Sequence, residues 1–192
     1  MLSNNLLKGD RVELVALEPE RDSKLWAEWR QNSEFTRLLD DAPATLYSRK
    51  ANKEWMEKHL EDFLEFEFMI RPLDQTEPIG FVGLEGNIRF HQDAFIGIGL
   101  GNPANWGKGY GTESMNLILR YAFLELNLHR VSLNVFGYNE RAIRSYQKNG
   151  FVIEGKAINA IERDSKFWDV YYMGILKREW LKSYQEISWK TQ

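Results

Sequence analysis

The sequence predicts a mixed α/β domain in which helices flank one large β-sheet. Strand-like and helix-like patterns follow one another along the 192 residues, in the order strand, two helices, several strands, helix, strand, helix and two strands. Hydrophobic residues make up 43% of the chain, which is enough to bury a core. Because no Pro/Gly/Ser-rich linker divides the chain, we expect one domain over 1–192.

The first half of the chain contains two predicted helices and four predicted strands. Alternating apolar residues predict the first strand over Arg11–Leu17. Pro19 suits the first turn of a helix, and apolar residues at helical spacing predict a second helix over Arg49–Leu64, after a polar loop at 40–48. Three further strands are predicted at 66–70, 79–84 and 94–100, and the last is nearly all apolar and therefore central.

The second half begins with a glycine-rich loop over 101–111. The helix after this loop carries one apolar stripe, formed by Met115, Ile118, Leu119, Ala122, Phe123 and Leu126. A strand is predicted at 131–135, followed by a short helix that Asn139 can cap and that ends before Gly150 in a left-handed conformation. Two closing strands are predicted at 151–161 and 166–176.

Composition excludes several classes of protein. The net charge of −3 argues against stable nucleic-acid binding, which usually needs a basic excess. The chain has no Cys, and its three His (His59, His91 and His129) include no close pair, so we expect no disulfide and no metal site. No window reaches 18 apolar residues and the first ten residues resemble no leader, so we expect no membrane association and a cytoplasmic protein.

The loop at 106–113 carries the strongest chemical signal. Its glycines permit positive φ angles, and its N–H groups together with the positive end of the following helix can hold a phosphate or pyrophosphate. A P-loop requires Ser or Thr after its lysine, whereas Gly109 follows Lys108. The dinucleotide fingerprint GxGxxG fails as well, because the loop has the spacing GxGxG. From these residues alone, a glycine-rich turn without a ligand stays open.

The loop resembles the acetyl-CoA loop of the GCN5-related N-acetyltransferases (GNAT family). Gly109 and Gly111 meet the family pattern Gln/Arg-x-x-Gly-x-Gly/Ala, and Trp106 stands at the Gln/Arg position, which the family uses largely for its backbone. Residues 139–151 resemble the next family motif, Asn-x-x-Ala-x-x-x-Tyr-x-x-x-Gly-Phe, in the family's order and spacing. More narrowly, the chain is similar to the subgroup that acetylates ribosomal-protein N-termini and polyamines. The resemblance extends more loosely from about Gly9 to Leu176, which implies a domain core over about 9–176 and a C-terminal extension over 177–192.

This resemblance implies the GNAT acyltransferase fold, a central mixed β-sheet that splits near Ile96–Leu100 and binds acetyl-CoA as cosubstrate. The pantetheine arm would bond the backbone in the split, and the pyrophosphate would lie over Gly107–Thr112. The implied cofactor-binding residues are Ile98, Leu100, Trp106, Gly107, Lys108, Gly109, Tyr110, Gly111, Thr112 and Asn139. Two of them have a structural alternative. Lys108 is then a solvated lysine, and Asn139 is then a helix cap that makes no contact with the cofactor.

The resemblance also implies acetyl transfer to a primary amine by direct attack in a ternary complex. Tyr146 matches the family tyrosine that protonates the departing thiolate, although a half-buried core aromatic is the alternative. A backbone N–H near Leu100 is the expected donor to the oxyanion. Glu85 is the candidate general base and His91 the second candidate, and a chain of waters is a third possibility.

The acceptor amine stays open between a protein N-terminus, a polyamine, an aminoglycoside and an amino-sugar. Asp40 and Asp41 attract a cationic acceptor or merely form a solvated turn. The alternative function is a catalytically silent acyl-CoA-binding regulatory module. Three aromatic residues near the end pack either on the domain's own sheet or on a partner subunit in a homodimer: Trp180, Tyr184 and Trp189.

Overall fold

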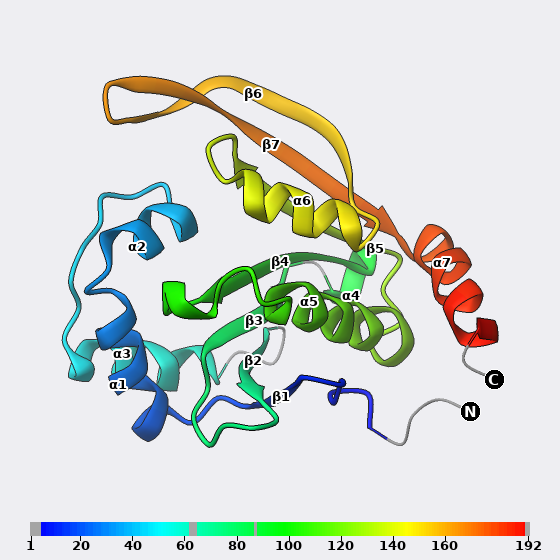
Figure 1. Cartoon of the computed structure of the whole chain (residues 1–192), viewed down its shortest axis with the longest axis horizontal. Coiled ribbons are helices and arrows are strands. Elements are labelled where there is room, and N and C mark those ends of the chain that lie inside the picture. Colours follow the sequence, from blue (N-terminus) through cyan, green and yellow to red (C-terminus); the bar gives the residue numbers. More distant parts are fainter. Residues whose placement is uncertain (1–4, 62–64, 87, 191–192) are drawn as a thin grey trace.

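A computed structural model confirms the α/β class. One seven-stranded sheet runs through the molecule in the order β1-β2-β3-β4-β5-β7-β6 (Figure 1). The structure describes residues 5–61, 65–86 and 88–190. The strands are β1 (Val12–Ala16), β2 (Phe66–Pro72), β3 (Gly80–Glu85), β4 (Asp93–Leu100), β5 (Arg130–Phe136), β6 (Val152–Arg163) and β7 (Lys166–Leu176). As its apolar composition predicts, β4 lies in the middle of the sheet.

The sheet splits between β4 and β5. All other neighbouring strands are antiparallel, but β4 and β5 are parallel and pair only where Asp93–Phe95 lies beside Arg130–Ser132. Beyond Phe95 the two strands diverge. The N–H of Gly101 donates to Ile79 on the β3 side at 3.0 Å. Because successive residues of a strand direct their backbone groups to alternate sides, Ile98 and Leu100 direct theirs into the split.

Helices cover both faces of this sheet. They are α1 (Pro19–Trp29), α2 (Ser33–Leu39), α3 (Arg49–His59), α4 (Ile88–His91), α5 (Tyr110–Arg120), α6 (Glu140–Lys148) and α7 (Lys177–Lys190). A 3₁₀ turn, η1 (Pro103–Asn105), precedes α5, and a π-helical segment, η2 (Tyr121–Glu125), continues it. None of the helices in the described part of the chain is long and apolar enough to cross a membrane.

Alternate residues of the strands build two large cores, and a third, small cluster is formed by Phe136, Ile161 and Val170. On one face, side chains such as Ile70, Val82 and Ile96 pack under α5, η2 and α6. On the other face, Met69 and Phe81 pack under α1 and α3. A strand sends successive side chains to opposite faces, so the parity of a residue in β2, β3 or β4 decides which core it joins. The two faces are called below the α5 face and the α1–α3 face.

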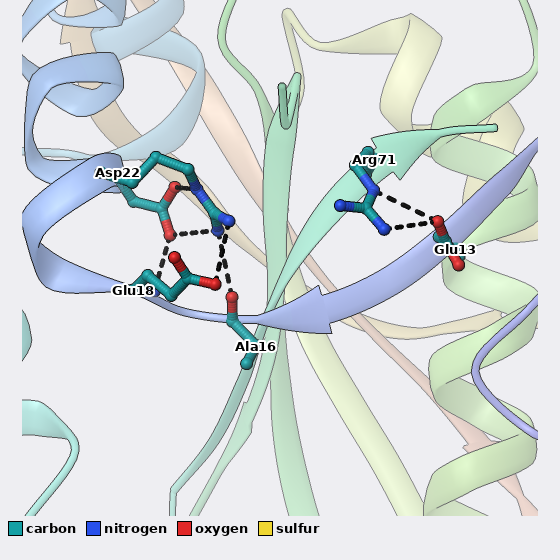
Figure 2. A network of polar contacts seen from close by, with 6 residues as sticks. Glu13, Ala16, Glu18, Asp22 and Arg71 are labelled. Carbon is teal, nitrogen blue, oxygen red and sulfur yellow. Dashed lines mark hydrogen bonds and ion pairs between the residues drawn. The ribbon is translucent and has the colours of Figure 1, made fainter. Parts of the chain in front are cut away.

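A buried carboxylate fixes the start of α1. Asp22 is fully buried, and its Oδ2 accepts from the N–H of Glu18 at 2.8 Å (Figure 2). Both its carboxylate oxygens also accept from the guanidinium of Arg21. A second ion pair, Arg71 to Glu13, ties β2 to β1 nearby (Figure 2). Arg21 also donates to the carbonyl of Ala16 at 3.2 Å, so its contacts tie the first turn of α1 to the end of β1 (Figure 2).

Besides the four-residue α4, which was not predicted, the structure differs from the sequence prediction at three helices. The seven-residue α2 was not predicted, although Asn32 caps it by accepting from the N–H of Glu34 at 2.9 Å. The prediction of a helix to Leu64 was wrong, because α3 ends at His59 and the side chain of Leu60 is exposed. Residues 62–64, which include two apolar positions of that prediction, lie outside the described residues.

The third difference is α7, which forms where only an extension was predicted. Trp180 is buried, with its ring centroid 5.3 Å from that of Phe123 and 4.5 Å from that of Tyr184. These two aromatic residues of the predicted trio therefore pack on the chain's own core. The side chain of Trp189 lies outside the described residues.

Candidate active site

The glycine loop is held in a conformation that suits an anion. Gly107 and Gly109 have φ angles of +74° and +88°, which residues other than glycine rarely adopt. The guanidinium of Arg11 donates to the carbonyl of Lys108 at 3.0 Å, and a Cβ added to Gly109 would lie 2.9 Å from Arg11 Nη1. Glu113 in turn accepts from the backbone N–H of Arg11 at 3.0 Å. The loop is therefore held by Arg11, which directly precedes β1, and Arg11 is in turn held by Glu113 of α5.

The loop ends at the N-terminus of α5, where Gly109 is the cap and offers no side chain. The N–H groups of the first turn have no acceptor within the helix, and the helix dipole adds positive potential at this end. Tyr110, Gly111 and Thr112 supply these N–H groups. This end of α5 is therefore suited to a phosphate group.

A cavity of about 270 Å³ lies against this loop, called here the first cavity. It is lined by nine of the residues predicted to bind the cofactor: Ile98, Leu100, Trp106, Gly107, Gly109, Tyr110, Gly111, Thr112 and Asn139. Lys108 does not line it, and the side chain of Lys108 is exposed. Tyr146 also borders the first cavity, so the structure brings the predicted general acid and the predicted cofactor site together.

Three cations on α6 border the first cavity and were not predicted: Arg141, Arg144 and Lys148. The guanidinium of Arg141 lies 3.8 Å from the ring centroid of Trp106, and burial lowers the pKa of Arg141. The indole Nε1 of Trp106 donates to the carbonyl of Leu100 at 2.8 Å. Trp106 thus fixes the end of β4 and supports a cation, two roles that its place in the glycine motif did not indicate. Positive charge here suits the phosphates of a nucleotide.

Tyr146 lies two turns along α6 from Asn139, whose side chain caps the helix by accepting from the N–H of Ala142 at 3.2 Å. The Tyr146 ring is half-buried, and its hydroxyl lies deep enough that burial raises the pKa of Tyr146 to about 12. The hydroxyl is therefore protonated at neutral pH. It forms no hydrogen bond with the described residues, so it is available as a proton donor.

A cavity of about 290 Å³, the junction cavity, continues from the first one through the split of the sheet. The two share five lining residues: Leu38, Leu39, Ile98, Asn139 and Tyr146. Asp40, Asp41 and Glu85 line the junction cavity on the far side. The predicted base and the predicted acidic pair therefore lie on the side of Tyr146 away from the glycine loop. The other candidate base, His91, lies in α4 and lines none of the cavities described in this section.

The loop after α2 is tied to the tip of the β6–β7 hairpin. The Nη2 of Arg163 donates to the carbonyls of Asp40, Asp41 and Ala42 at 3.4, 2.7 and 3.1 Å. Beside it, Arg37 forms an ion pair with Asp164 at 2.8 Å. These contacts place the acidic pair at the rim of the junction cavity, although the two halves of the contact are far apart in the sequence.

A third space, the distal cavity, lies on the α1–α3 face and measures about 400 Å³. It shares Asp40, Glu85 and Gly97 with the junction cavity. Its walls are aromatic and charged: Trp26, Arg30, Trp55, His59, Glu67 and Phe81. This cavity was not predicted, because its lining residues come from six helices and strands and form no local motif. Among the described residues, no group of three or more metal-ligating side chains is placed to hold a metal ion.

Known proteins resemble the chain in sequence and in structure. A family model for the GNAT acetyltransferase domain matches residues 11–152. The chain belongs to the GNAT acetyltransferase family. Its activity is therefore the transfer of an acetyl group to an amine, and the mixed sheet with its split is the GNAT fold.

Two GNAT relatives and one crystal structure are similar to this chain over most of its length. The spermidine N(1)-acetyltransferase of Vibrio cholerae is 33% identical over 129 residues, which cover 67% of this chain and 73% of that protein. The probable N-acetyltransferase YjcK of Bacillus subtilis is 34% identical over 177 residues, covering 89% and 97%. The crystal structure of the Vibrio cholerae spermidine enzyme with CoA and spermine has a TM-score of 0.79 at 30% identity, covering 88% and 98%. These names favour an enzyme over the silent acyl-CoA-binding module.

Proposed function

We propose that the protein transfers the acetyl group of acetyl-CoA to a primary amine of a linear polycationic amine, in a ternary complex. One observation carries this proposal. The phosphate-suited first cavity opens through the split sheet, past Tyr146, into a space whose rim bears three carboxylates: Asp40, Asp41 and Glu85. An anionic cosubstrate and a cationic acceptor thus have separate entrances that meet at one hydroxyl.

The cosubstrate is placed by backbone groups first and by cations second. The N–H groups at the start of α5 bind the pyrophosphate, and Arg141 on its Trp106 support adds charge beside it. The pantetheine arm lies in the split and bonds the backbone of Ile98 and the N–H of Leu100. The carbonyl of Leu100 already accepts a hydrogen bond from Trp106, so the N–H of Leu100 is the backbone group of this residue that remains for the pantetheine arm.

The reaction needs an acid for the thiolate and a base for the amine. The neutral amine attacks the thioester carbonyl carbon, the carbon–sulfur bond breaks, and the leaving sulfur takes the proton of Tyr146. Glu85 accepts the proton that the amine loses, directly or through water, because it borders the acceptor side of the junction cavity. His91 is not used, since it lines neither the junction cavity nor the distal cavity.

A polyamine fits the acceptor side better than the other amines considered. Carboxylates attract ammonium groups, and the aromatic rings of the distal cavity bind cations and methylene chains alike. The name of the Vibrio cholerae relative, a spermidine acetyltransferase, supports the same class.

The first test is thermal unfolding with acetyl-CoA, NAD and ATP in parallel, followed by thiol release with an amine panel. A ligand at about 100 times its Kd adds roughly 2.7 kcal/mol to stability, which shifts the melting temperature by several degrees. We expect a shift with acetyl-CoA alone, and faster thiol release with spermidine than with an aminoglycoside, an amino-sugar or a peptide with a free N-terminus. No shift, or a larger shift with NAD or ATP, would refute the cosubstrate assignment. A peptide that outpaces spermidine would refute the acceptor class.

A further inference from the structure

The distal cavity contains a buried carboxylate oxygen that no described residue satisfies. The side chain of Glu67 is 8% exposed, and its Oε2 accepts from His59 Nε2 at 2.8 Å. Its Oε1 has no hydrogen-bond partner. A buried charged oxygen without a donor costs free energy, so such a group is expected to meet a donor when the protein works. Since Glu67 lines the distal cavity, that donor can come from a ligand.

The rest of the Glu67 carboxylate is held firmly. His59 is bonded on both sides, through Nε2 to Glu67 and through Nδ1 to Glu65 at 2.5 Å. Its ring also stacks on Trp55, with 4.8 Å between centroids. These contacts fix the orientation of the Glu67 carboxylate, so the free oxygen belongs to a rigid group rather than to a solvated surface acid.

A bare strip of backbone connects Glu67 to the reacting centre. In the sheet register Glu67 lies opposite Gly83, and Gly83 lies opposite Gly97. Residues directly opposite share a face, so this row lies on the α1–α3 face and carries no side chain after Glu67. A Cβ added to Gly97 would have nothing within 4 Å. Gly97 also borders the junction cavity with Tyr146, so the strip runs from one cavity into the other.

The length of the strip sets the size of the ligand. Neighbouring strands lie about 4.8 Å apart, so Glu67 in β2 is about 10 Å from β4 at the edge of the split. The strip is a narrow track without polar side chains, which suits a methylene chain. Trp26 and Trp55 form a wall beside it, with ring centroids 5.3 Å apart.

The charges of the side chains that line the distal cavity favour a cation beside Glu67. The carboxylates of Asp40, Glu67 and Glu85 line it together with one permanent cation, Arg30, and the imidazole of His59. Arg30 already lies over aromatic rings, with its guanidinium 4.9 Å from the ring centroid of Tyr47. Two donors, Arg30 Nε and Trp26 Nε1, are also unpartnered among the described residues. A ligand with a carbonyl or carboxylate is therefore the competitor that the test must include.

We propose that Glu67 binds a second ammonium group of the acceptor, about 10 Å from the amine that is acetylated. The second ammonium donates to the free Oε1, the chain between the two amines lies over Gly83 and Gly97, and Trp26 and Trp55 cover it. Glu67 thereby selects linear diamines and polyamines over monoamines. This inference rests on the proposed function for the identity of the reacting amine, but the Glu67 site itself is defined by its own contacts.

The test compares acceptors in the wild type and in a Glu67→Gln variant, which keeps the shape of the side chain and removes its charge. We measure the ratio of kcat/KM for spermidine to kcat/KM for butylamine, together with calorimetric binding of spermidine without acetyl-CoA. A charge-assisted hydrogen bond predicts that the ratio falls roughly 10- to 100-fold in Glu67→Gln and that spermidine binding weakens by a similar factor. The matched control is Glu65→Gln, which removes a carboxylate from the other side of His59 but leaves the free oxygen; its ratio is expected within about threefold of wild type.

A second variant guards against a folding defect in Glu67→Gln. Trp55 is 45% exposed, so Trp55→Ala leaves the core intact and removes one wall of the cavity. We expect a severalfold higher KM for spermidine with little change in kcat. A Glu67→Gln ratio within twofold of wild type would overturn the proposal, and so would wild type that shows no preference for spermidine over butylamine. So would an amino acid or peptide that displaces spermidine from the cavity.

The design separates this proposal from the proposed function. A wild type that acetylates no amine, but binds spermidine more tightly than Glu67→Gln does, removes the assigned reaction and retains the Glu67 site. A wild type that acetylates amines with a ratio unaffected by Glu67→Gln retains the reaction and removes the site. Absence of spermidine binding to wild type removes the site whatever the turnover.

Discussion

The two proposed ligand sites, on opposite faces of the central sheet, are built in different ways. On the α5 face, the first cavity takes its positive-φ glycines and free N–H groups from one loop and the start of α5, and side chains such as Trp106 and Arg141 complete its lining. On the α1–α3 face, the distal cavity consists of side chains such as Trp26, Trp55 and Glu67. A backbone site needs particular spacings of glycine, whereas a side-chain site needs residues that only the fold brings together. Variants on the two faces should therefore have different consequences.

The largest effect is expected at the point where the two faces meet. Tyr146→Phe removes the proton donor, so we expect kcat to fall by roughly 10²- to 10⁴-fold. The ring is retained, so the calorimetric Kd for acetyl-CoA should change little. Because burial raises the pKa of Tyr146 to about 12, the wild-type rate should show no alkaline loss from this group below about pH 11. Full turnover in Tyr146→Phe would remove this residue from the mechanism.

A change confined to the cofactor side comes next. Gly109→Ala forces a side chain into a positive-φ position at a cost of about 1–2 kcal/mol, and places a Cβ against Arg11. We expect the Kd for acetyl-CoA to rise about tenfold, with the ratio between acceptors unchanged. Gly155→Ala is the control, since a Cβ there meets nothing within 4 Å. Equal affinities in the two variants would show that the loop conformation does not matter for binding.

A change confined to the acceptor side should act on KM alone. The double variant Asp40→Asn/Asp41→Asn removes two charges from the rim, so we expect KM for spermidine to rise severalfold at low salt and the difference to shrink at high salt. The Kd for acetyl-CoA serves as the internal control. An unchanged KM for every cationic acceptor would leave the pair as a solvated turn, the alternative that the sequence allowed.

The smallest effect concerns stability on the acceptor side. The hydrogen bond from His59 to Glu67 raises the pKa of His59 above its ordinary value of about 6.5. Protonation of His59 therefore stabilises the fold, and this contribution is complete below about pH 6.5 and is lost as pH rises through the raised pKa. We expect the free energy of urea unfolding to fall over this range, and to fall less in Glu67→Gln. Glu57→Gln, on the exposed side of α3, should follow wild type; identical slopes in all three would contradict the assignment.

Features that follow from local sequence rules were predicted well. The distal cavity was not predicted, because only the fold brings its side chains together. The central place of β4 and the left-handed Gly150 follow from local rules, and both were confirmed. Glu67 was missed because, between Phe66 and Phe68, a charged residue in an alternating strand indicates a solvated face. Only the packing of α1 and α3 over that face converts a surface position into a buried one.

The helices that were missed or predicted too long each have a separate explanation. The α2 helix has seven residues, too few for a periodic pattern to stand out, although Asn32 gave a cap signal that could have located it. Predicting α3 through Leu64 followed the apolar stripe alone, whereas the exposed Leu60 shows that the stripe continues after the helix stops. In α7, Trp180 and Tyr184 are four residues apart, which is helical spacing, but two aromatic residues in a short terminal segment are too few to distinguish a helix from an irregular extension.

The bonds between Arg163 and the carbonyls of residues 40–42 also order events during synthesis. The partners are separated by 121 to 123 residues, so none of these bonds can form on the ribosome until residue 163 has left the exit tunnel. The contact between Arg11 and Glu113, which helps to hold the glycine loop, spans about a hundred residues and becomes possible earlier. A nascent chain can therefore form this contact of the glycine loop before it can close the rim at residues 40–42. Closing that long loop is also the costlier step in chain entropy, though only slightly, because the cost grows with the logarithm of length.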